Sequence, residues 1–166
     1  MKKILLFLIS VLICSVGFAQ ATYTSNATGN WASAGTWTLT SGTDGDSDAW
    51  PDSNDTVIID SGDTVTVASA AAVSVLTNNG TKLILNADLT VGSDVTLNSP
   101  TDLNGGNMIV SGDVTNTDVL IIYAGSYLQL SESSKTFTNS DRIYAYGGED
   151  SFSRIIVAGT ISDSGG

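Results

Sequence analysis

Short β-prone runs, each ended by a turn signal, fill the sequence after residue 56. In several of them an apolar residue alternates with Thr, Gln or Tyr, as at Val65 and Val67 or at Leu128 and Leu130. A period of two places successive side chains on opposite faces, so each strand buries one face. The pattern predicts an all-β chain, with no helical pattern after the N-terminal leader. The runs are residues 56–59, 64–67, 73–76, 82–85, 89–91, 95–97, 108–110, 119–123, 127–130, 142–146 and 154–157.

The residues between the runs are those that favour tight turns. Ser61-Gly62-Asp63 and Asn79-Gly80-Thr81 each precede a new run, and similar triplets recur later in the chain. Gly and Asn accept positive φ, while Asp and Ser hydrogen-bond their own backbone. Of the 17 acidic residues 15 are Asp, a bias toward turns and away from helices.

Two architectures fit many short strands: an antiparallel β-sandwich and a parallel β-solenoid. Corners as short as Asn86-Ala87 are too tight for reversals between long strands and favour the solenoid. In a solenoid each strand stacks on the coil below, which buries ladders of Val, Ile and Leu. The wider gaps at Ser99–Asn107 and Gly147–Ser153 are predicted to be loops that protrude from one side.

The N-terminal leader, residues 1–19, has the pattern of a secretory signal peptide. Lys2 and Lys3 precede the apolar run Ile4–Val16, and Gly17-Phe18-Ala19 offers small residues for cleavage after Ala19. The predicted division is a signal peptide (1–19), a cap with an acidic loop (20–55) and solenoid coils (56–166). We expect an extracellular or outer cell-surface protein that is not embedded in a membrane after cleavage.

Charge and composition exclude several classes of function. Without Lys2 and Lys3, four basic residues remain against 17 acidic ones, a formal charge of −13, so the mature chain should repel nucleic acid and anionic membranes. The chain has no His, and its only cysteine, Cys14, lies in the leader. His-dependent triads, thiol nucleophiles and His-ligated zinc sites are therefore excluded from the mature chain.

Residues 28–38 (TGNWASAGTWT) and 50–67 (WPDSNDTVIIDSGDTVTV) carry a family resemblance. They resemble the opening module of many secreted bacterial surface proteins, and are similar to the extracellular domain named for its eight glycines. The resemblance implies a right-handed parallel β-helix with a Trp-rich cap, export, and often a longer chain with a type IX sorting domain. We therefore expect this chain to be truncated at its C-terminus. The matching positions are Gly29, Asn30, Trp31, Trp37, Pro51, Asp55, Val57, Ile59, Gly62, Thr64 and Val65.

The stretch DGDSDAWPDSND, residues 44–55, raises the question of calcium. Its alternating aspartates resemble an EF-hand loop, but Ala49 stands where that loop needs Gly, and Asp55 replaces the final Glu. Two interpretations stay open: a looser calcium site formed by Asp44, Asp46 and Asp48, and an ordinary solvated acidic loop.

The aromatic residues suggest carbohydrate binding, because flat rings suit sugar faces. Trp31 and Trp37 lie where the resemblance places the cap and are interpreted as structural. Trp50, beside the acidic loop, is the predicted ligand-binding residue, with a polysaccharide or cell-surface glycan as its candidate partner. The tyrosines at 123, 127, 144 and 146 are further surface candidates, for which aromatic stacks between coils are the alternative.

The leading functional hypothesis is a non-enzymatic, secreted or cell-surface β-solenoid module, an adhesin-like stalk or binding platform. The alternative is the N-terminal part of a polysaccharide-degrading β-helix enzyme, a lyase or glycoside hydrolase, whose active site lies beyond Gly166. The nearest charged pairs, Asp141-Arg142 and Glu149-Asp150, are interpreted as loop charges, and no catalytic residue is assigned. A third hypothesis is a self-assembling matrix protein whose open coils polymerise.

Overall fold

Strands three apart in the sequence are neighbours in the computed structural model, which describes residues 20–45, 47–147 and 153–163. They pair in parallel, so the chain winds through about five coils from β4 to β18. This confirms the predicted parallel β-helix and excludes the antiparallel sandwich. The predicted signal peptide lies outside the described residues.

The strands are three or four residues long in most cases, and only one helical turn, η1 (Ala34–Thr36), occurs among the described residues. No helix in that part of the chain is long and apolar enough to cross a membrane. The strands are β1 (Thr22–Ser25), β2 (Gly29–Asn30), β3 (Trp37–Ser41), β4 (Thr56–Ile59), β5 (Thr64–Val67), β6 (Ala71–Val73), β7 (Val75–Asn78), β8 (Lys82–Leu85), β9 (Leu89–Val91), β10 (Val95–Leu97), β11 (Thr101–Leu103), β12 (Met108–Val110), β13 (Val114–Asn116), β14 (Leu120–Ile122), β15 (Tyr127–Leu130), β16 (Thr136–Asn139), β17 (Ile143–Ala145), β18 (Arg154–Val157) and β19 (Thr160–Asp163).

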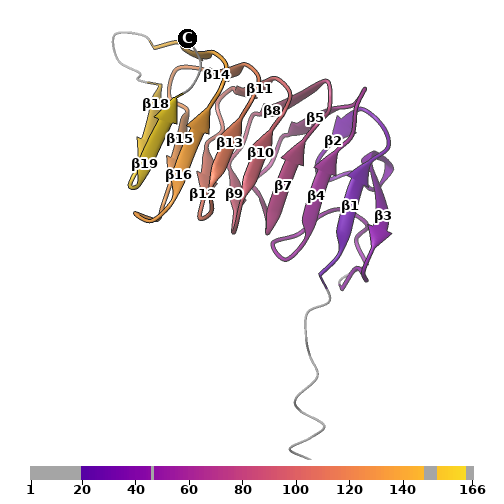
Figure 1. The fold of residues 1–166 in the computed structure, drawn as a ribbon. Coiled ribbons are helices and arrows are strands. Elements are labelled where there is room, and N and C mark those ends of the chain that lie inside the picture. The colour runs from indigo at the N-terminus through magenta and orange to yellow at the C-terminus, as the bar shows by residue number, and fades with distance from the viewer. Residues whose placement is uncertain (1–19, 46, 148–152, 164–166) are drawn as a thin grey trace, which may run out of the picture.

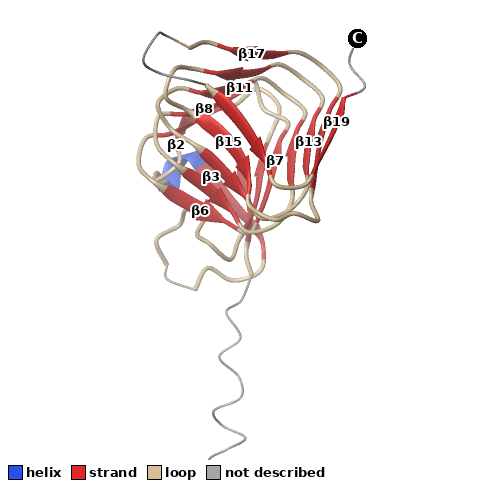
Figure 2. Ribbon diagram, turned by 90° about the vertical axis from the view of Figure 1, so that its left-hand side faces the viewer, coloured by secondary structure: helices blue, strands red, loops and turns tan. Residues whose placement is uncertain are grey.

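Three sheets enclose the interior. Sheet A has the order β19-β16-β13-β10-β7-β4-β1-β3, sheet B has β17-β14-β11-β8-β5-β2, and sheet C has β18-β15-β12-β9-β6. Figure 1 shows the strands of sheet A side by side along the stack. In the turned view of Figure 2, strands of the three sheets lie on different sides of the interior. One coil therefore consists of one strand from each sheet and the three corners between them.

Alternate residues of each strand face the interior and stack on the same position one coil later. In sheet A, Val57, Leu76, Val95 and Val114 are successive partners at an even spacing in the sequence, and none is more than 1% exposed. The outward positions between them hold mostly Thr and Ile of intermediate exposure. The interior is therefore a set of aliphatic ladders, as the alternation predicts.

The run 73–76 was predicted as one strand, and this prediction is wrong. Val73 ends β6 in sheet C, Ser74 forms the corner, and Val75 begins β7 in sheet A. Both halves are apolar because each contributes to the ladder of its own sheet. A corner of a single residue leaves no turn signal beyond one serine.

The predicted loop at Ser99–Asn107 is also wrong in part, because it contains β11 in sheet B. Two of the three β11 residues are polar, yet all three are buried. Thr101 Oγ1 accepts a hydrogen bond from Asn78 Nδ2 at 3.1 Å, and Asp102 Oδ2 lies 2.6 Å from Lys82 Nζ. The partners that allow this burial come from the preceding coil, so local sequence does not reveal the strand.

Counted along sheet A from β4, the number of residues per coil first increases after β13. Phe137 follows its partner Val114 at a wider spacing than earlier partners in sheet A have, and most of the extra residues lie between Leu130 and Phe137. The other predicted loop, at Gly147–Ser153, falls largely outside the described residues.

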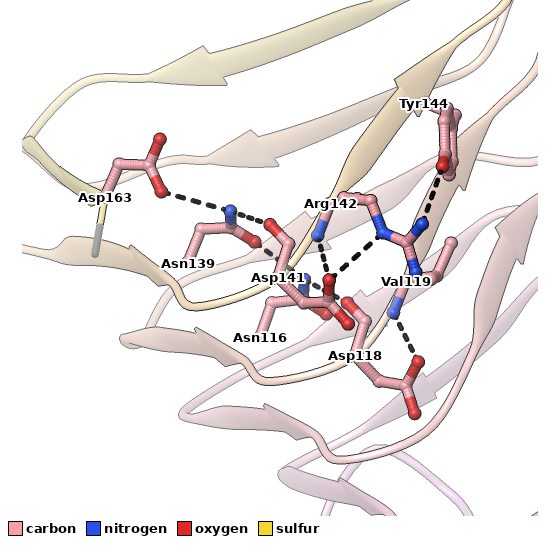
Figure 3. Close-up of polar contacts among 8 residues, drawn as sticks. All are labelled: Asn116, Asp118, Val119, Asn139, Asp141, Arg142, Tyr144 and Asp163. Carbon is pink, nitrogen blue, oxygen red and sulfur yellow. Dashed lines mark hydrogen bonds and ion pairs between the residues drawn. The ribbon is translucent and has the colours of Figure 1, made fainter. Parts of the chain in front are cut away.

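Asparagine side chains occupy the corner between sheets A and B (Figure 3). Asn78, Asn116 and Asn139 end strands of sheet A and are at most 5% exposed. Asn78 Nδ2 donates to the carbonyl oxygen of Ser99 at 3.2 Å, and Asn116 Nδ2 to that of Asp118 at 2.6 Å. These amides satisfy corner carbonyls that have no strand partner, which is the requirement for burying a turn.

Aspartates play a similar part at the corner between sheets C and A. Asp94 Oδ1 accepts the backbone N–H of Asp113 at 2.9 Å, and Asp113 Oδ1 accepts that of Thr136 at 2.7 Å. Each of these carboxylates thus binds an amide one coil further on, rather than its own backbone as the turn pattern suggested. Corner aspartates therefore link the coils.

A tryptophan-rich cap closes the first coil. β1 pairs in parallel with β4 on one side and antiparallel with β3 on the other, so β3 forms the end of sheet A (Figure 1). Trp31 and Trp37 are 2% and 5% exposed, with ring centroids 5.1 Å apart in an edge-to-face arrangement. Trp37 Nε1 donates to the carbonyl oxygen of Trp31 at 2.6 Å. The predicted Trp-rich cap is confirmed.

Candidate functional site

The acidic segment, residues 44–55, forms a hydrogen-bonded loop between β3 and β4. Asp44 accepts the backbone N–H groups of Ser47 and Ala49, each at 3.0 Å, through its two carboxylate oxygens. Ser47 and Ala49 both have φ of 66°, in the left-handed region that side chains disfavour. Asp48 Oδ1 accepts the N–H of Trp50 at 3.1 Å. Two of the predicted calcium ligands therefore also stabilise the backbone of this loop.

The third predicted ligand, Asp46, lies outside the described residues. Among the residues that are described, no three His, Cys, Asp or Glu side chains are grouped so that they could hold a metal ion. Calcium binding by Asp44, Asp46 and Asp48 stays a prediction of the sequence.

The loop concentrates negative charge against the first coil. Burial raises the pKa of the Tyr23 hydroxyl, and the carboxylates of Asp44, Asp55 and Asp48 raise it further. Burial also raises the pKa of Asp55, even though the N–H groups of Asp52 and Ala21 donate to its carboxylate at 2.9 Å and act in the opposite direction. The environment of Asp55 thus favours its protonated form relative to water.

Trp50 lines a pocket of about 220 Å³ at the cap end of the solenoid. Trp31 and the segment Trp50–Ser53 form one part of the wall, and Ser69–Ala72, which includes the start of β6, forms the other. Trp50 is half-buried and packs against the core. The residue predicted to bind a ligand therefore lies beside a cavity, together with a tryptophan that was interpreted as structural. The sequence patterns did not indicate Ser69–Ala72, because small residues carry no signal of a site.

A second aromatic surface lies on sheet B at the other end of the stack. The ring of Tyr146 stacks on those of Tyr123 and Tyr144, with centroid distances of 5.6 Å and 6.4 Å. Tyr144 and Tyr146 are 38% and 54% exposed. The stacking of Tyr123 on Tyr146 joins one coil to the next, which is the structural alternative considered for these tyrosines. Tyr127 begins β15 in sheet C and contributes to neither ring pair.

The charged pair Asp141-Arg142 lies beside this aromatic surface (Figure 3). Arg142 Nε is 3.3 Å from Asp141 Oδ1, and Arg142 Nη1 donates to the Tyr144 hydroxyl at 3.3 Å. Its guanidinium carbon lies 6.0 Å from the centroid of the Tyr144 ring. Arg142 is therefore held by its neighbours in the strand. The other pair, Glu149-Asp150, lies outside the described residues.

A search against protein-family models, curated proteins and solved structures finds no match to this chain. Function is therefore inferred from the residues and their geometry. The described residues offer a small pocket at the cap and an exposed aromatic surface on sheet B, on a scaffold of linked coils.

Proposed function

We propose that this chain is a non-enzymatic, secreted or cell-surface β-solenoid module that acts as an adhesin-like stalk or binding platform. The observation that carries the proposal is the linkage of successive coils. Side chains bond one coil to the next in addition to the strand pairing, as from Asp94 to Asp113 and from Asn116 to Asn139. A stack linked in this way suits a spacer that holds a binding surface away from the cell.

The proposed location rests on the sequence. The leader pattern of residues 1–19 supports export, and residues 23–67 resemble the opening module of secreted bacterial surface proteins. Two residues of that resemblance, Trp31 and Trp37, form the cap. With cleavage after Ala19, the proposed module would begin at Gln20, shortly before this cap.

The hydrogen bonds that the aspartate carboxylates accept support the proposal that this chain is not an enzyme. A glycosidase needs two carboxyl groups directed at its substrate. Here the carboxylates of Asp44, Asp52, Asp55, Asp94 and Asp113 accept backbone N–H groups. Their contacts are those of structural residues. A polysaccharide or cell-surface glycan is the proposed partner, because both candidate surfaces present aromatic rings.

Export of the full chain tests the proposed location. In a bacterial host we expect the product outside the cytoplasm, with Gln20 as its first residue on N-terminal sequencing. The matched control is Leu8→Arg, which places a charge in the apolar run of the leader and should keep the protein inside. A wild-type product that stays in the cytoplasm with residues 1–19 attached would contradict the proposal.

Incubation of the exported protein with plant and bacterial polysaccharides tests the absence of catalysis. We expect no more reducing sugar ends, or unsaturated ends of the kind a lyase leaves, than with heat-denatured protein. Release that depends on folded protein would favour the polysaccharide-degrading alternative.

A further inference from the structure

The pocket beside Trp50 has the features of a site for a small polar ligand with a flat apolar face. We propose that it binds one neutral sugar unit, at the end or on a branch of a glycan. The inference rests on the proposed function as a binding platform and names its ligand class.

The walls of the pocket come from segments that are held in place independently. Trp31 Nε1 donates to the carbonyl oxygen of Pro51 at 3.4 Å, which ties the cap to the segment that carries Trp50. On the other side, Ala71 N–H donates to the carbonyl oxygen of Asp88 at 2.9 Å in the next coil. The cavity is thus bounded by fixed backbone, and binding needs little reorganisation.

The pocket combines aromatic and polar groups. The half-buried Trp50 offers an aromatic surface for the C–H groups of a sugar ring. Ser53 and Ser69 carry hydroxyls for which the described residues provide no hydrogen-bond partner. β6 is the last strand of sheet C, so its backbone groups on the pocket side have no neighbouring strand. A ligand with several hydroxyl groups matches this set.

The volume limits how much of a glycan can enter. The pocket has a volume of about 220 Å³. Sites for drug-sized ligands are larger, at about 300–1,000 Å³. The space suits a single six-membered sugar ring rather than several rings at once.

Charge selects against acidic sugars. Asp52 lines the pocket, and its Oδ1 accepts the Asn54 N–H at 2.8 Å, which leaves Oδ2 as an acceptor for a ligand hydroxyl. The same loop also carries Asp48, and the chain without Lys2 and Lys3 has a formal charge of −13. A uronic acid would bring a further negative charge close to Asp52 and be repelled. Neutral hexoses and N-acetylated hexosamines carry no such penalty.

Titration calorimetry on the exported protein tests the proposal, since its signal does not depend on tryptophan. The probes are methyl glycosides of glucose, galactose, mannose and N-acetylglucosamine, compared with glucuronic and galacturonic acids. We expect saturable binding of at least one neutral glycoside, with a dissociation constant on the order of 1 mM for a single small ring. The two acids should bind at least about tenfold more weakly, given their repulsion from Asp52.

Variants locate the site. Trp50→Ala should weaken binding about tenfold through loss of the aromatic surface, while Trp50→Phe should retain most of it. Ala71→Leu should block the pocket and keep every polar group, and its melting curve checks that the fold persists. Asp52→Asn should reduce the discrimination against the acids. Tyr144→Ala is the matched aromatic control on sheet B and should bind normally.

Absence of binding to every neutral glycoside would overturn the proposal, as would unchanged binding in a folded Ala71→Leu variant. Loss of binding in Tyr144→Ala with retention in Trp50→Ala would place the sugar on sheet B and also overturn it. Export does not depend on the pocket. An exported protein that binds no sugar therefore contradicts this inference alone, whereas a sugar-binding protein retained in the cytoplasm contradicts only the proposed location.

Discussion

The side-chain amide of Asn116 donates to the side-chain oxygen of Asn139 in the next coil, across 2.8 Å and inside the solenoid. Asn139 Nδ2 continues the series by donating to the carbonyl oxygen of Asp141 and to Asp163 Oδ1 (Figure 3). Leu97 occupies the same position one coil before Asn116 and is fully buried. An apolar residue therefore fits this register in the neighbouring coil, and what Asn116 and Asn139 add there is the hydrogen bonds of their amide groups.

Asn116→Leu tests the energetic value of this ladder. The side chain would remain accommodated, but Asn139 Oδ1 and the carbonyl oxygen of Asp118 would lose their donor. We expect a loss of about 1–3 kcal/mol in the free energy of unfolding, the usual cost of buried polar groups left without partners. Urea denaturation with an unchanged m-value would measure it.

The matched control is Asn98→Ala. Asn98 Nδ2 donates to Asn79 Oδ1 at 2.8 Å in an exposed ladder on the outside of the same corner. Water can replace that bond, so we expect a change within about 0.5 kcal/mol. Equal losses in Asn98→Ala and Asn116→Leu would show that burial does not determine the strength of the ladder.

The cap is predicted to depend on both rings and on one N–H group. Trp31→Ala or Trp37→Ala should lower the free energy of unfolding by about 3–5 kcal/mol through loss of a buried ring. Trp37→Phe keeps an aromatic ring but leaves the Trp31 carbonyl oxygen without its donor, for which we expect about 1–3 kcal/mol. Thermal melts check all three. A melting curve unchanged in Trp37→Ala would show that the buried rings of the cap do not stabilise the fold.

Two glycines are predicted to differ in their tolerance of a side chain. A Cβ at Gly106 would overlap the backbone of Ala87 in the coil below, whereas a Cβ at Gly92 would meet the nearest atom, Val73 O, at 3.7 Å. Gly106→Ala should therefore cost at least about 1–3 kcal/mol, as overpacking does. Gly92→Ala should be nearly neutral. Chemical denaturation of the two variants decides this, and similar stabilities would count against the close approach of the coils at Gly106.

Asp55 is predicted to make stability depend on pH. Because its pKa is raised in the folded protein, the folded state binds the proton more tightly than the unfolded state. The contribution of Asp55 is fully present below its unfolded pKa, about 3.9, and is lost as pH rises through the raised folded value. Relative to Asp55→Asn, which does not titrate there, the wild type should gain stability as pH falls. Denaturation of both proteins across this range measures the difference, and a constant difference would contradict the raised pKa.

Calcium binding by the acidic loop is checked by melting the protein with millimolar calcium and then with a chelator. Binding to the folded state alone raises the melting temperature. We expect this rise to disappear in the variant with Asn at positions 44, 46 and 48. Because Asp44 also caps the backbone of its loop, Asp44→Asn is melted without calcium as a control. A rise that persists in the triple variant would place the ion elsewhere.

Much of the strand pattern could be predicted from the sequence. Residues 56–59, 64–67, 82–85 and 127–130 were assigned as strands with the bounds that β4, β5, β8 and β15 have. In 64–67 and 127–130 alternation alone distinguishes the buried face, whereas 56–59 and 82–85 also carry an isoleucine on the outer face. The candidate site was predicted only at Trp50, which is aromatic and lies beside a polar loop. The rest of its pocket is formed by neighbours of Trp50, by Trp31 of the cap and by small residues at 69–72.

The two errors have different causes. β11 was interpreted as part of a loop, but Thr101 accepts a hydrogen bond from Asn78 and Asp102 pairs through Oδ2 with Lys82, both in the preceding coil. Residues 73–76 were interpreted as one strand because a corner made of Ser74 alone does not interrupt the apolar pattern.

The sequence by itself determined that the chain forms short strands with one buried face, joined by tight turns, because both depend on adjacent residues. Only the tertiary structure decided which polar residues are buried, which corners form a pocket and how the coils align. Those outcomes depend on partners in the neighbouring coil, such as Val114 and Phe137, which pair although a whole coil of sequence separates them. A hydrogen bond or ion pair between residues so far apart in the sequence cannot be predicted from the local pattern.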